Sequence, residues 1–483
     1  MPSQPLYDLG NDKHVFVDSS LIEADRGKGP AKSPLGRGLR LSVHKPSLDT
    51  RPLIQMDMPW EGVLNGGGSL FEEEGRYRLY YECRPLGAGS DSWAVACAES
   101  DNGSEWTKPN LGIVEFGGST NNNLVFDASV ASRPLWGVSV FRDYIAETVR
   151  RFKLVYHSPY RDGSAMFAAV SADGFQWNPF ESPALLGDVT GDTTFAGFDA
   201  DRGKYFAYLN VVTEGQSTFT FTETHTFENW PAPVSVTGPE LGGDADSGGV
   251  MTGYARWPGA DAHSMFQDYR PAGTGPRVIR MLTSRDGRSW RAQHDNFLVD
   301  TDAFEAASGY FCADGLVGLR PGELSLLITP ARWTPPDFAA PAAARPSESN
   351  RAYYALTWRQ DGLMSLEADT IGECQTIPFT FDGESLRINS SARAGGSLRF
   401  ELLDASGPES AKVRAVEGRR FADCDPVVGD HLDHTVTWGG QSDLSAWSGR
   451  PVRVGISMRE AHLYSLRFHS EVRSLTDGVV AWG

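Results

Sequence analysis

A short motif recurs along the first 300 residues, and it constrains the fold more than any other feature of this sequence. An apolar residue or Thr is followed by Ser, an Asp-Gly or Asn-Gly step and, three residues after the Gly, Trp. Clear copies lie at 98–106, 170–177 and 283–290, and a degenerate copy lies at 224–230. Because Asp-Gly supplies a positive φ, each copy predicts a tight turn between neighbouring strands. We interpret the motif as a folding element that carries no catalysis.

Each copy follows a pair of short runs with strand composition, so the motif marks repeated β units. Five such units can be counted, and Gly and aromatic residues, each about 11% of the chain, suit a turn-rich all-β fold. The pattern predicts a five-bladed β-propeller, with the Trp of each motif between successive blades. The expected first strands of the units are Gly68–Phe71, Phe152–Tyr156, Thr193–Phe198, Gly249–Tyr254 and Gly315–Leu319.

The pattern changes after about residue 372, where apolar and polar residues alternate strictly and Gly, Asp and Ser turns separate the runs. Such alternation predicts a β-sandwich with one solvated face, which we expect to be structural rather than catalytic. One apolar face should hold Leu386, Ile388, Leu398, Phe400, Leu402, Val452, Val454 and Ile456. The predicted domains are an N-terminal segment packing on the propeller (1–50), the propeller (51–370), the sandwich (371–472) and a tail (473–483).

Charge and cysteine content narrow the classes of partner. The net charge of −18 argues against nucleic acid and anionic membrane surfaces, because no basic excess is present to neutralise phosphates. The five scattered cysteines are interpreted as buried reduced thiols rather than as disulfides or zinc ligands. We predict no cofactor and no metal. The N-terminus resembles no signal peptide, so the protein is expected to be cytoplasmic, or secreted after its signal has been removed.

Acidic residues precede several of the expected first strands. A propeller gathers the starts of its innermost strands at the axis, so carboxylates there could face one substrate. Two carboxylates are the minimum for glycoside hydrolysis, because one protonates the leaving oxygen and the other attacks or activates water. Trp60 and Trp136 are candidates for an aromatic platform under the sugar. The candidate carboxylates are Glu61, Asp143, Asp192, Asp246 and Glu305.

Seven segments carry a resemblance to a known superfamily: 15–18, 59–62, 77–81, 121–125, Asp192 before Phe195, 202–205 and 443–453. With these residues the sequence resembles the five-bladed propeller glycosidases, namely invertases, fructan hydrolases and arabinanase-like enzymes. It looks closest to a bacterial glycosidase-like group, over about residues 12 to 470. The resemblance implies hydrolysis of a furanosidic or related glycan. It also implies a nucleophile on blade one, an Arg-Asp pair on blade two and an acid on blade three.

Carried over by position, the resemblance makes Asp192 the general acid and Glu61 or Asp143 the nucleophile or base. Asp246 is a further catalytic candidate. Further candidates for binding the oligo- or polysaccharide substrate are Asn65, His157, Arg161, Asp268, Arg270 and Glu305. Two alternatives stay open. A non-catalytic sugar-binding propeller would stack glycans on Trp60 and Trp136, and a glycoside phosphorylase would use the His and Arg residues to handle phosphate.

Overall fold

The computed structural model describes residues 6–23, 35–186, 194–213, 216–236, 250–269, 278–299, 304, 309–331, 352–407 and 413–470. Contacts between residues divide the chain into two compact units. The propeller unit holds the described residues from Lys45 to Thr357 except 259–262. The sandwich unit holds the described residues of 6–44, 259–262 and 358–470.

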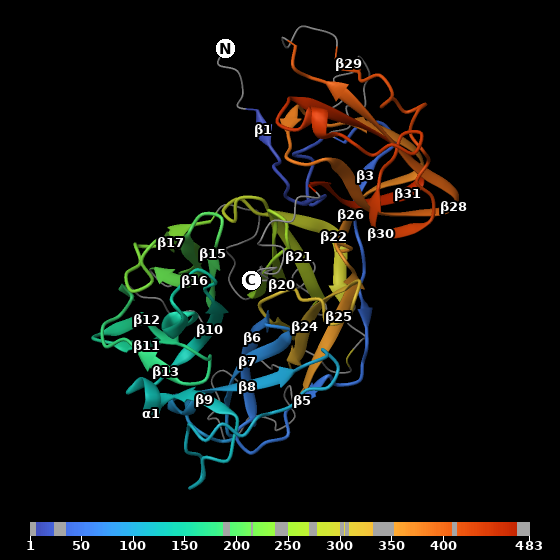
Figure 1. The fold of residues 1–483 in the computed structure, drawn as a ribbon. Coiled ribbons are helices and arrows are strands. Elements are labelled where there is room, and N and C mark those ends of the chain that lie inside the picture. Colours follow the sequence, from blue (N-terminus) through green and yellow to red (C-terminus); the bar gives the residue numbers. More distant parts are fainter. Residues whose placement is uncertain are drawn as a thin grey trace. The chain divides into compact units, whose positions relative to one another are not determined.

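The propeller unit contains five sheets that surround a common axis (Figure 1). Apart from β14 in blade two and β4 and β5 in blade five, the strands of each sheet are neighbours in chain order, so each blade is built on a meander. Blade one is β6 (Val63–Glu73), β7 (Arg76–Arg84), β8 (Ala94–Ser100) and β9 (Leu124–Asp127). Blade two is β10 (Trp136–Arg142), β11 (Phe152–Tyr160), β12 (Gly163–Ser171), β13 (Trp177–Pro179) and β14 (Leu185–Leu186). Blade three is β15 (Thr194–Asp199), β16 (Lys204–Thr213), β17 (Gln216–Thr224) and β18 (Val234–Ser235).

Blade four is β19 (Val250–Arg256), β20 (His263–Tyr269), β21 (Val278–Ser284) and β22 (Arg291–Val299). Blade five is β23 (Gly309–Cys312), β24 (Glu323–Ala331) and β25 (Ala352–Arg359), and β25 pairs with β4 (Ser47–Leu48) and β5 (Ile54–Gln55). The two strands that precede blade one in the chain therefore complete blade five. This pairing closes the ring and covers the outer edge of β25 in the last blade.

The innermost strands are tied to one another around the axis. Ser69 Oγ accepts a hydrogen bond from Val140 N (3.0 Å), which joins blade one to blade two. Ser139 Oγ accepts from Ala196 N (3.1 Å), which joins blade two to blade three. Asp314, just after β23, joins blade five to its two neighbours, because its N donates to Gly68 O (2.8 Å) and its Oδ1 accepts from Tyr254 N (3.0 Å). These bonds satisfy buried backbone groups that the blades themselves leave unpaired.

The recurring motif forms the turn after the third strand of a blade, as the sequence predicts. In blade two, Ser171 Oγ accepts from Gly174 N (2.9 Å), and Asp173 Oδ1 accepts from Phe175 N (2.8 Å) and Gln176 N (2.9 Å). The other two clear copies repeat these bonds, with Ser100 and Asn102 or Ser284 and Asp286 as the acceptors. The Ser, Asp and Asn side chains of the motif therefore hydrogen-bond within their own turn, which confirms their role as a folding element.

The same turns dock on the neighbouring blade. Gly174 has a φ of +82°, and a Cβ added to it would lie 2.3 Å from Tyr80 Oη on blade one. Gly287 faces Tyr208 of blade three in the same way, and the Tyr208 hydroxyl donates to Gly287 O (2.5 Å). The Trp residues that end the motifs share hydrophobic clusters with the preceding blade: Trp177 with Tyr80, Trp230 with Val155, and Trp290 with Tyr208. The predicted position of these Trp residues between blades is confirmed.

Two of the expected first strands are misplaced by one strand. Phe152–Tyr156 belongs to β11, the second strand of blade two, because the true first strand β10 comes ahead of it. In blade five the first strand is β23, whereas the expected run Gly315–Leu319 follows it. Both true first strands carry Gly at or near their start, and β23 has only four residues, so their β pattern is weak in the sequence.

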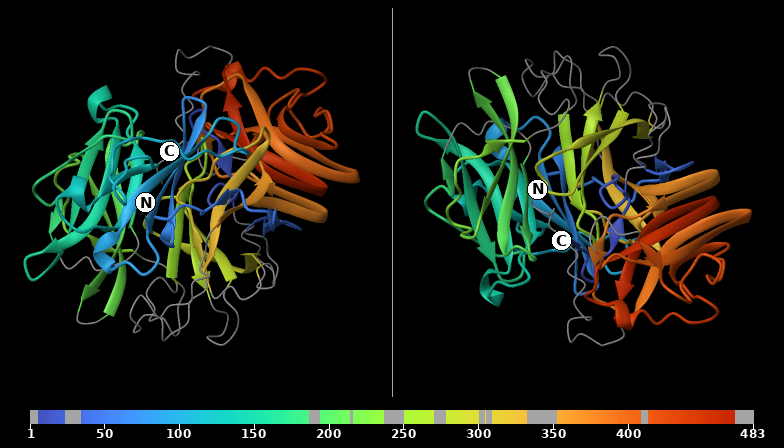
Figure 2. Two further views of the ribbon diagram at one scale, coloured as in Figure 1. Left: turned by 90° about the horizontal axis from the view of Figure 1, so that it is seen from below. Right: turned by 90° about the horizontal axis from the view of Figure 1, so that it is seen from above.

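The sandwich unit is built on two long strands, β28 (Ser385–Asp404) and β31 (Val452–His469), which pair along most of their length. Register shifts at 389–390 and 392–397 interrupt this pairing, so each strand can bend and contribute to two layers. The long strands are curved in both views of Figure 2. β26 (Met364–Gln375), β27 (Phe379–Thr380), β29 (Arg414–Ala415) and β30 (Asp430–Thr435) complete the sheet with the N-terminal strands. All eight residues of the predicted apolar face lie in one buried cluster.

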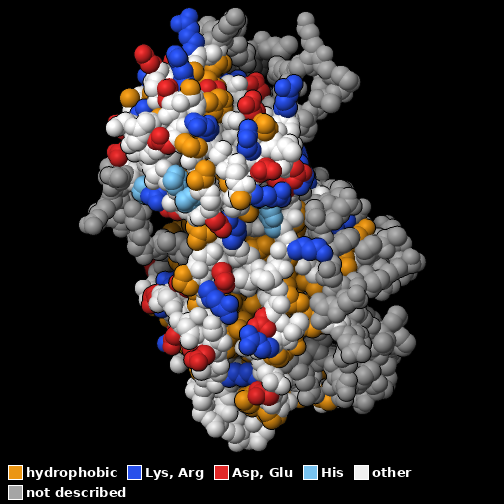
Figure 3. Space-filling model, turned by 90° about the vertical axis from the view of Figure 1, so that its right-hand side faces the viewer, with side chains coloured by type: hydrophobic (Ala, Val, Ile, Leu, Met, Phe, Trp, Pro, Cys, Tyr) orange, Lys and Arg blue, Asp and Glu red, His pale blue; other side chains and the backbone are white. Residues whose placement is uncertain are grey.

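The N-terminal strands β1 (Tyr7–Asp8), β2 (His14–Val15) and β3 (Arg40–Val43) pair with β27, β31 and β26 of the sandwich unit. Within residues 1–50, only β4 pairs with a propeller strand among the described residues. The helices of the described residues have three or four residues each: α1 (Ala128–Ala131) and the 3₁₀ turns at 90–92, 148–150 and 445–447. No described helix is long and apolar enough to cross a membrane. On the face drawn in Figure 3, acidic and basic side chains are interspersed.

Candidate functional site

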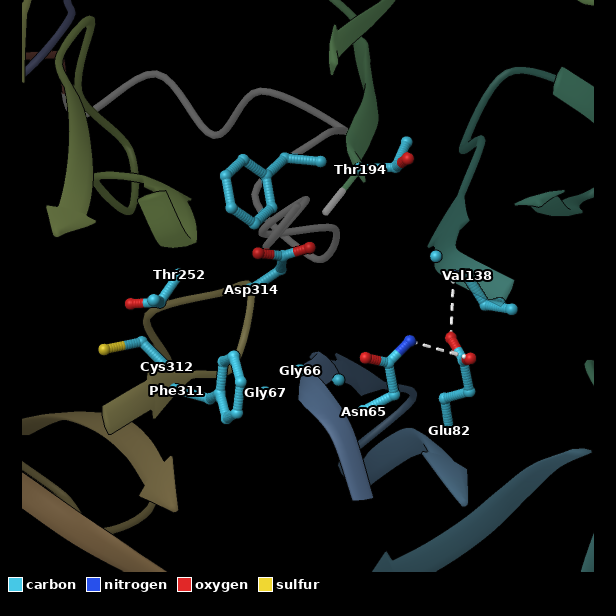
Figure 4. A pocket seen from close by; sticks show the side chains of 13 residues that line it. Asn65, Gly66, Gly67, Glu82, Val138, Thr194, Thr252, Phe311, Cys312 and Asp314 are labelled. Carbon is cyan, nitrogen blue, oxygen red and sulfur yellow. Dashed lines mark hydrogen bonds between the residues drawn. The ribbon is translucent and has the colours of Figure 1, made fainter. Parts of the chain in front are cut away.

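A pocket lies on the propeller axis, at the starts of the innermost strands (Figure 4). Its empty space, counted together with its open mouth, is about 350 Å³. We call it the axial pocket. Every blade contributes to its lining, which consists of Asn65, Gly66, Gly67, Gly68, Glu82, Gly137, Val138, Thr194, Phe195, Thr252, Phe311, Cys312 and Asp314.

Glu82 is the axial-pocket carboxylate of blade one. It lies on β7 opposite Asn65 of β6, and its side chain is buried. Asn65 Nδ2 donates to Glu82 Oε1 (2.9 Å), and Val138 N of blade two donates to Oε2 (3.2 Å). Both bonds are drawn in Figure 4. The two donors hold the plane of the carboxylate at the wall of the pocket.

Asp314 is the axial-pocket carboxylate of blade five, and its side chain points into the pocket in Figure 4. Its Oδ1 accepts one hydrogen bond, from Tyr254 N, and no other described residue donates to the carboxylate. Burial raises the pKa of Asp314 well above its usual range, because desolvation disfavours the charged form. The shift favours the protonated form of Asp314, which is the form that could donate a proton.

Glu61 is buried away from the axial-pocket lining. Its Oε1 accepts from the Tyr81 hydroxyl (2.5 Å), and its Oε2 accepts from Met58 N (2.9 Å) and Lys108 Nζ (2.6 Å). Lys108 also pairs with Asp57 (2.9 Å) at the surface. A carboxylate with three donors, one of them a buried cation, is a structural anchor of the segment that leads into β6.

Asp143 follows the last residue of β10, whereas the sequence interpretation placed it ahead of the first strand of blade two. Its Oδ1 accepts from Ile145 N and Ala146 N (both 3.1 Å), so it caps the turn after β10. Its Oδ2 accepts from the Tyr205 hydroxyl (2.5 Å) and lies 3.6 Å from Lys153 Nζ. The structure thus places Asp143 in a turn at the other end of β10, outside the axial-pocket lining.

The remaining predicted residues of blades one and two divide between the pocket and its surroundings. Asn65 lines the pocket. Trp60 donates from Nε1 to Asn123 Oδ1 (2.9 Å) and packs edge-on against Phe116, so it is engaged outside the pocket lining. Trp136 starts β10 next to the lining residue Gly137, and its ring lies 6.4 Å from the ring of His157.

His157 lies directly behind the lining, fully buried, and hydrogen-bonds through Nε2 to Thr194 Oγ1. Burial lowers the pKa of His157 to about 4, so the ring is neutral at pH 7. Arg161 lies in the exposed turn between β11 and β12, with its guanidinium over Tyr160. Neither residue lines the axial pocket.

Asp268 is buried near the end of β20. Burial and, to a lesser extent, the nearby charge of Asp268 raise the pKa of the Cys312 thiol, which places Asp268 close to the axial-pocket lining. The other predicted residues, Asp192, Asp246, Arg270 and Glu305, lie outside the described residues, so their assignments stay predictions. Across the described part of the chain, no group of three His, Cys, Asp or Glu side chains could hold a metal ion.

The sequence interpretation missed both axial-pocket carboxylates, yet each had a signal. Glu82 interrupts the apolar run 79–83, where a charged residue needs a reason to be buried. Asp314 precedes Gly315 as in the motif, but no Ser precedes it and no Trp follows, so its side chain is not consumed by a motif turn. A departure from the repeat was therefore the signal in blade five.

No protein-family model and no curated protein matches this sequence. Many solved structures are similar to it, including a thermostable family-43 glycoside hydrolase (13% identity, 64% of this protein, 95% of that one, TM-score 0.43). The exo-inulinase from Aspergillus awamori matches with 11% identity over 89% of this protein and 99% of its own length (TM-score 0.44). A β-fructofuranosidase from Schwanniomyces occidentalis matches with 12% identity over 88% and 99% (TM-score 0.42). At these identities the likeness is one of fold.

Proposed function

We propose that this protein is a glycoside hydrolase that cleaves a furanosidic, fructo- or arabinofuranoside-like, or related glycan in the axial pocket. One observation carries the proposal: two carboxylates from different blades, the buried Glu82 and the half-buried Asp314, line one pocket on the axis, and desolvation disfavours the charged form of Asp314. An acid and a base of different protonation state are what glycosidic cleavage requires. The sugar class comes from the resemblance of the sequence to the propeller glycosidases.

In this proposal Asp314 is the general acid. It donates its proton to the glycosidic oxygen as the bond from that oxygen to the anomeric carbon breaks, and the alcohol leaves neutral. Glu82 supplies the second carboxylate, which either attacks the anomeric carbon or takes a proton from the attacking water. Asn65 and Val138 N hold Glu82 in place for that role. Asp192, two residues before Thr194 in the chain, stays the alternative acid.

The proposal is tested with purified protein and aryl α- and β-furanosides and pyranosides. We expect turnover of at least one furanoside and a roughly 10²–10⁴-fold lower kcat for Asp314→Asn and for Glu82→Gln. Glu228→Gln, which alters an exposed ion pair with Arg150, is the matched control and should keep the kcat of the native protein. Because burial raises the pKa of Asp314, the pH at which activity falls as this acid loses its proton should lie above the usual range of an aspartate.

Other results would redirect the assignment. Sugar binding without product release selects a carbohydrate-binding propeller. Activity that requires inorganic phosphate and releases a sugar 1-phosphate selects a phosphorylase. Loss of activity in Asp192→Asn but not in Asp314→Asn would move the acid to blade three. Turnover of no glycoside, with ligand binding intact in Asp314→Asn, would overturn catalysis.

A further inference from the structure

A second cavity occupies the other half of the propeller axis. The axial pocket uses the first residues of β6, β10, β15 and β19, and the second cavity uses later residues of the same strands. We call it the far cavity. It encloses about 580 Å³ of empty space including its mouth. Its lining is Ser69, Leu70, Phe71, Val140, Phe141, Arg142, Tyr144, Ala196, Gly197, Phe198, Phe206, Tyr254, Ala255, Arg256, Asp314 and Gly315.

The walls of the far cavity are mainly apolar and aromatic. Phe198 and Phe206 are only half-buried, and Phe206 packs edge-on against Tyr254 with ring centroids 5.3 Å apart. Gly197 makes room for this ring, because a Cβ there would lie 2.5 Å from Phe206 Cζ. Exposed aromatic faces in a cavity of this size favour a ligand with a flat apolar ring.

The charges around the far cavity follow the ends of the strands. Four successive innermost strands end in residues of alternating sign: Glu73, Arg142, Asp199 and Arg256. Arg142 pairs with Glu73, and Arg256 pairs with Asp199 (3.6 Å) and Asp201 (2.5 Å). Only the two arginines belong to the lining, whereas the acids lie behind them.

Two further observations bear on what the polar part of the lining could bind. Arg142 Nε is buried and has no hydrogen-bond partner among the described residues, so this ion-paired guanidinium keeps one N–H to donate. Asp314, which lines both cavities, has its pKa raised by burial, which disfavours its charged form. The polar part of the far cavity therefore presents cationic donors that an anion could use, and a guanidinium binds a carboxylate with good geometry.

We propose that the far cavity is a second binding site, for a small aromatic carboxylate whose ring packs against Phe198 and Phe206 and whose carboxylate meets Arg142 and Arg256. The site uses a different set of residues from the axial pocket, apart from Asp314. It does not depend on the proposed hydrolase activity, and its test reads binding alone.

Calorimetry with 1-naphthoate and its neutral isostere 1-naphthamide tests this site on the full chain. We expect naphthoate to bind at least about tenfold more tightly, because charge-assisted hydrogen bonds are stronger than neutral ones. Arg256→Gln should remove that preference. Arg150→Gln, an arginine of an exposed ion pair elsewhere in the propeller, should keep it. Phe206→Leu should weaken both compounds, and Glu82→Gln should change neither.

Circular dichroism and the melting temperature establish that each variant is folded. If Arg256→Gln does not fold, the double variant Arg142→Gln with Glu73→Gln removes one ion pair as a unit and serves the same purpose. Equal affinity for the two compounds, or no binding of either at millimolar concentration, would overturn the proposal. So would naphthoate binding that survives Arg256→Gln but is lost in Glu82→Gln, because the ligand would then occupy the axial pocket.

Discussion

The propeller holds two pairs of carboxylates that differ in what surrounds them. Glu61 and Asp143 each accept three hydrogen bonds and lie beside a lysine, at 2.6 and 3.6 Å. Glu82 and Asp314 line the axial pocket, where Asn65 and Val138 N donate to Glu82 and Tyr254 N donates to Asp314. Burial alone does not distinguish the two pairs, since Glu82 is buried as Glu61 and Asp143 are. The partners decide, because a carboxylate neutralised by a cation has no proton to exchange with a substrate.

The largest loss of stability that tests this comparison is expected on replacing Glu61. Glu61→Gln leaves the ammonium of Lys108 with only the exposed Asp57 as an anionic partner, so the free energy of unfolding should fall by about 3–5 kcal/mol. Urea denaturation measures this loss. Asp57→Asn, the matched control on the same lysine, should cost less than about 1 kcal/mol because Asp57 is exposed. Equal losses would show that Glu61 is not the anchor of this cluster.

A second test uses His157, which lies behind the axial pocket. Its pKa is lowered from 6.5 to about 4, so the fold favours the neutral ring. The resulting stability is present above pH 6.5 and is lost as the pH falls toward 4, in total about 3 kcal/mol. Between pH 7 and pH 4, the free energy of unfolding should therefore fall more steeply with falling pH for the native protein than for His157→Gln. Parallel pH dependences would mean that the fold does not lower the pKa of His157.

A smaller loss of stability should distinguish a turn whose Gly packs against the neighbouring blade from a turn whose Gly has open space beside it. Gly174→Ala forces a non-Gly residue to a φ of +82° and places its Cβ against Tyr80 of the next blade. Gly118→Ala meets the same backbone strain at a φ of +85°, with nothing within 4 Å. Both should lose about 1 kcal/mol to strain, and Gly174→Ala should lose a further 1–3 kcal/mol to the collision. Equal melting temperatures would contradict the docking of motif turns between blades.

Much of the fold could be predicted from the sequence because it is written in local patterns. The motif turns close through bonds within seven residues, and the strict alternation at 398–402 and 452–456 marks one face of a sheet. The first strands of blades two and five were displaced for the same reason. β10 and β23 have Gly137 and Gly309 near or at their starts, and β23 has only four residues, so these strands are recognised through their pairing with β11 and β24.

By itself the sequence determined the repeat, the turns, the all-β class and the expectation that acids near strand starts would gather at the axis. Only the tertiary structure decided which acids face the axial pocket. Glu61 precedes β6 and could have pointed to the axis, but Lys108 and Tyr81, distant in the chain, donate hydrogen bonds to its oxygens. Glu82 sits inside β7 and reaches the pocket because β6 opens at Gly66–Gly68 in front of it. The protonation of a carboxyl depends on its solvation and its neighbours in space, and only the folded protein fixes both.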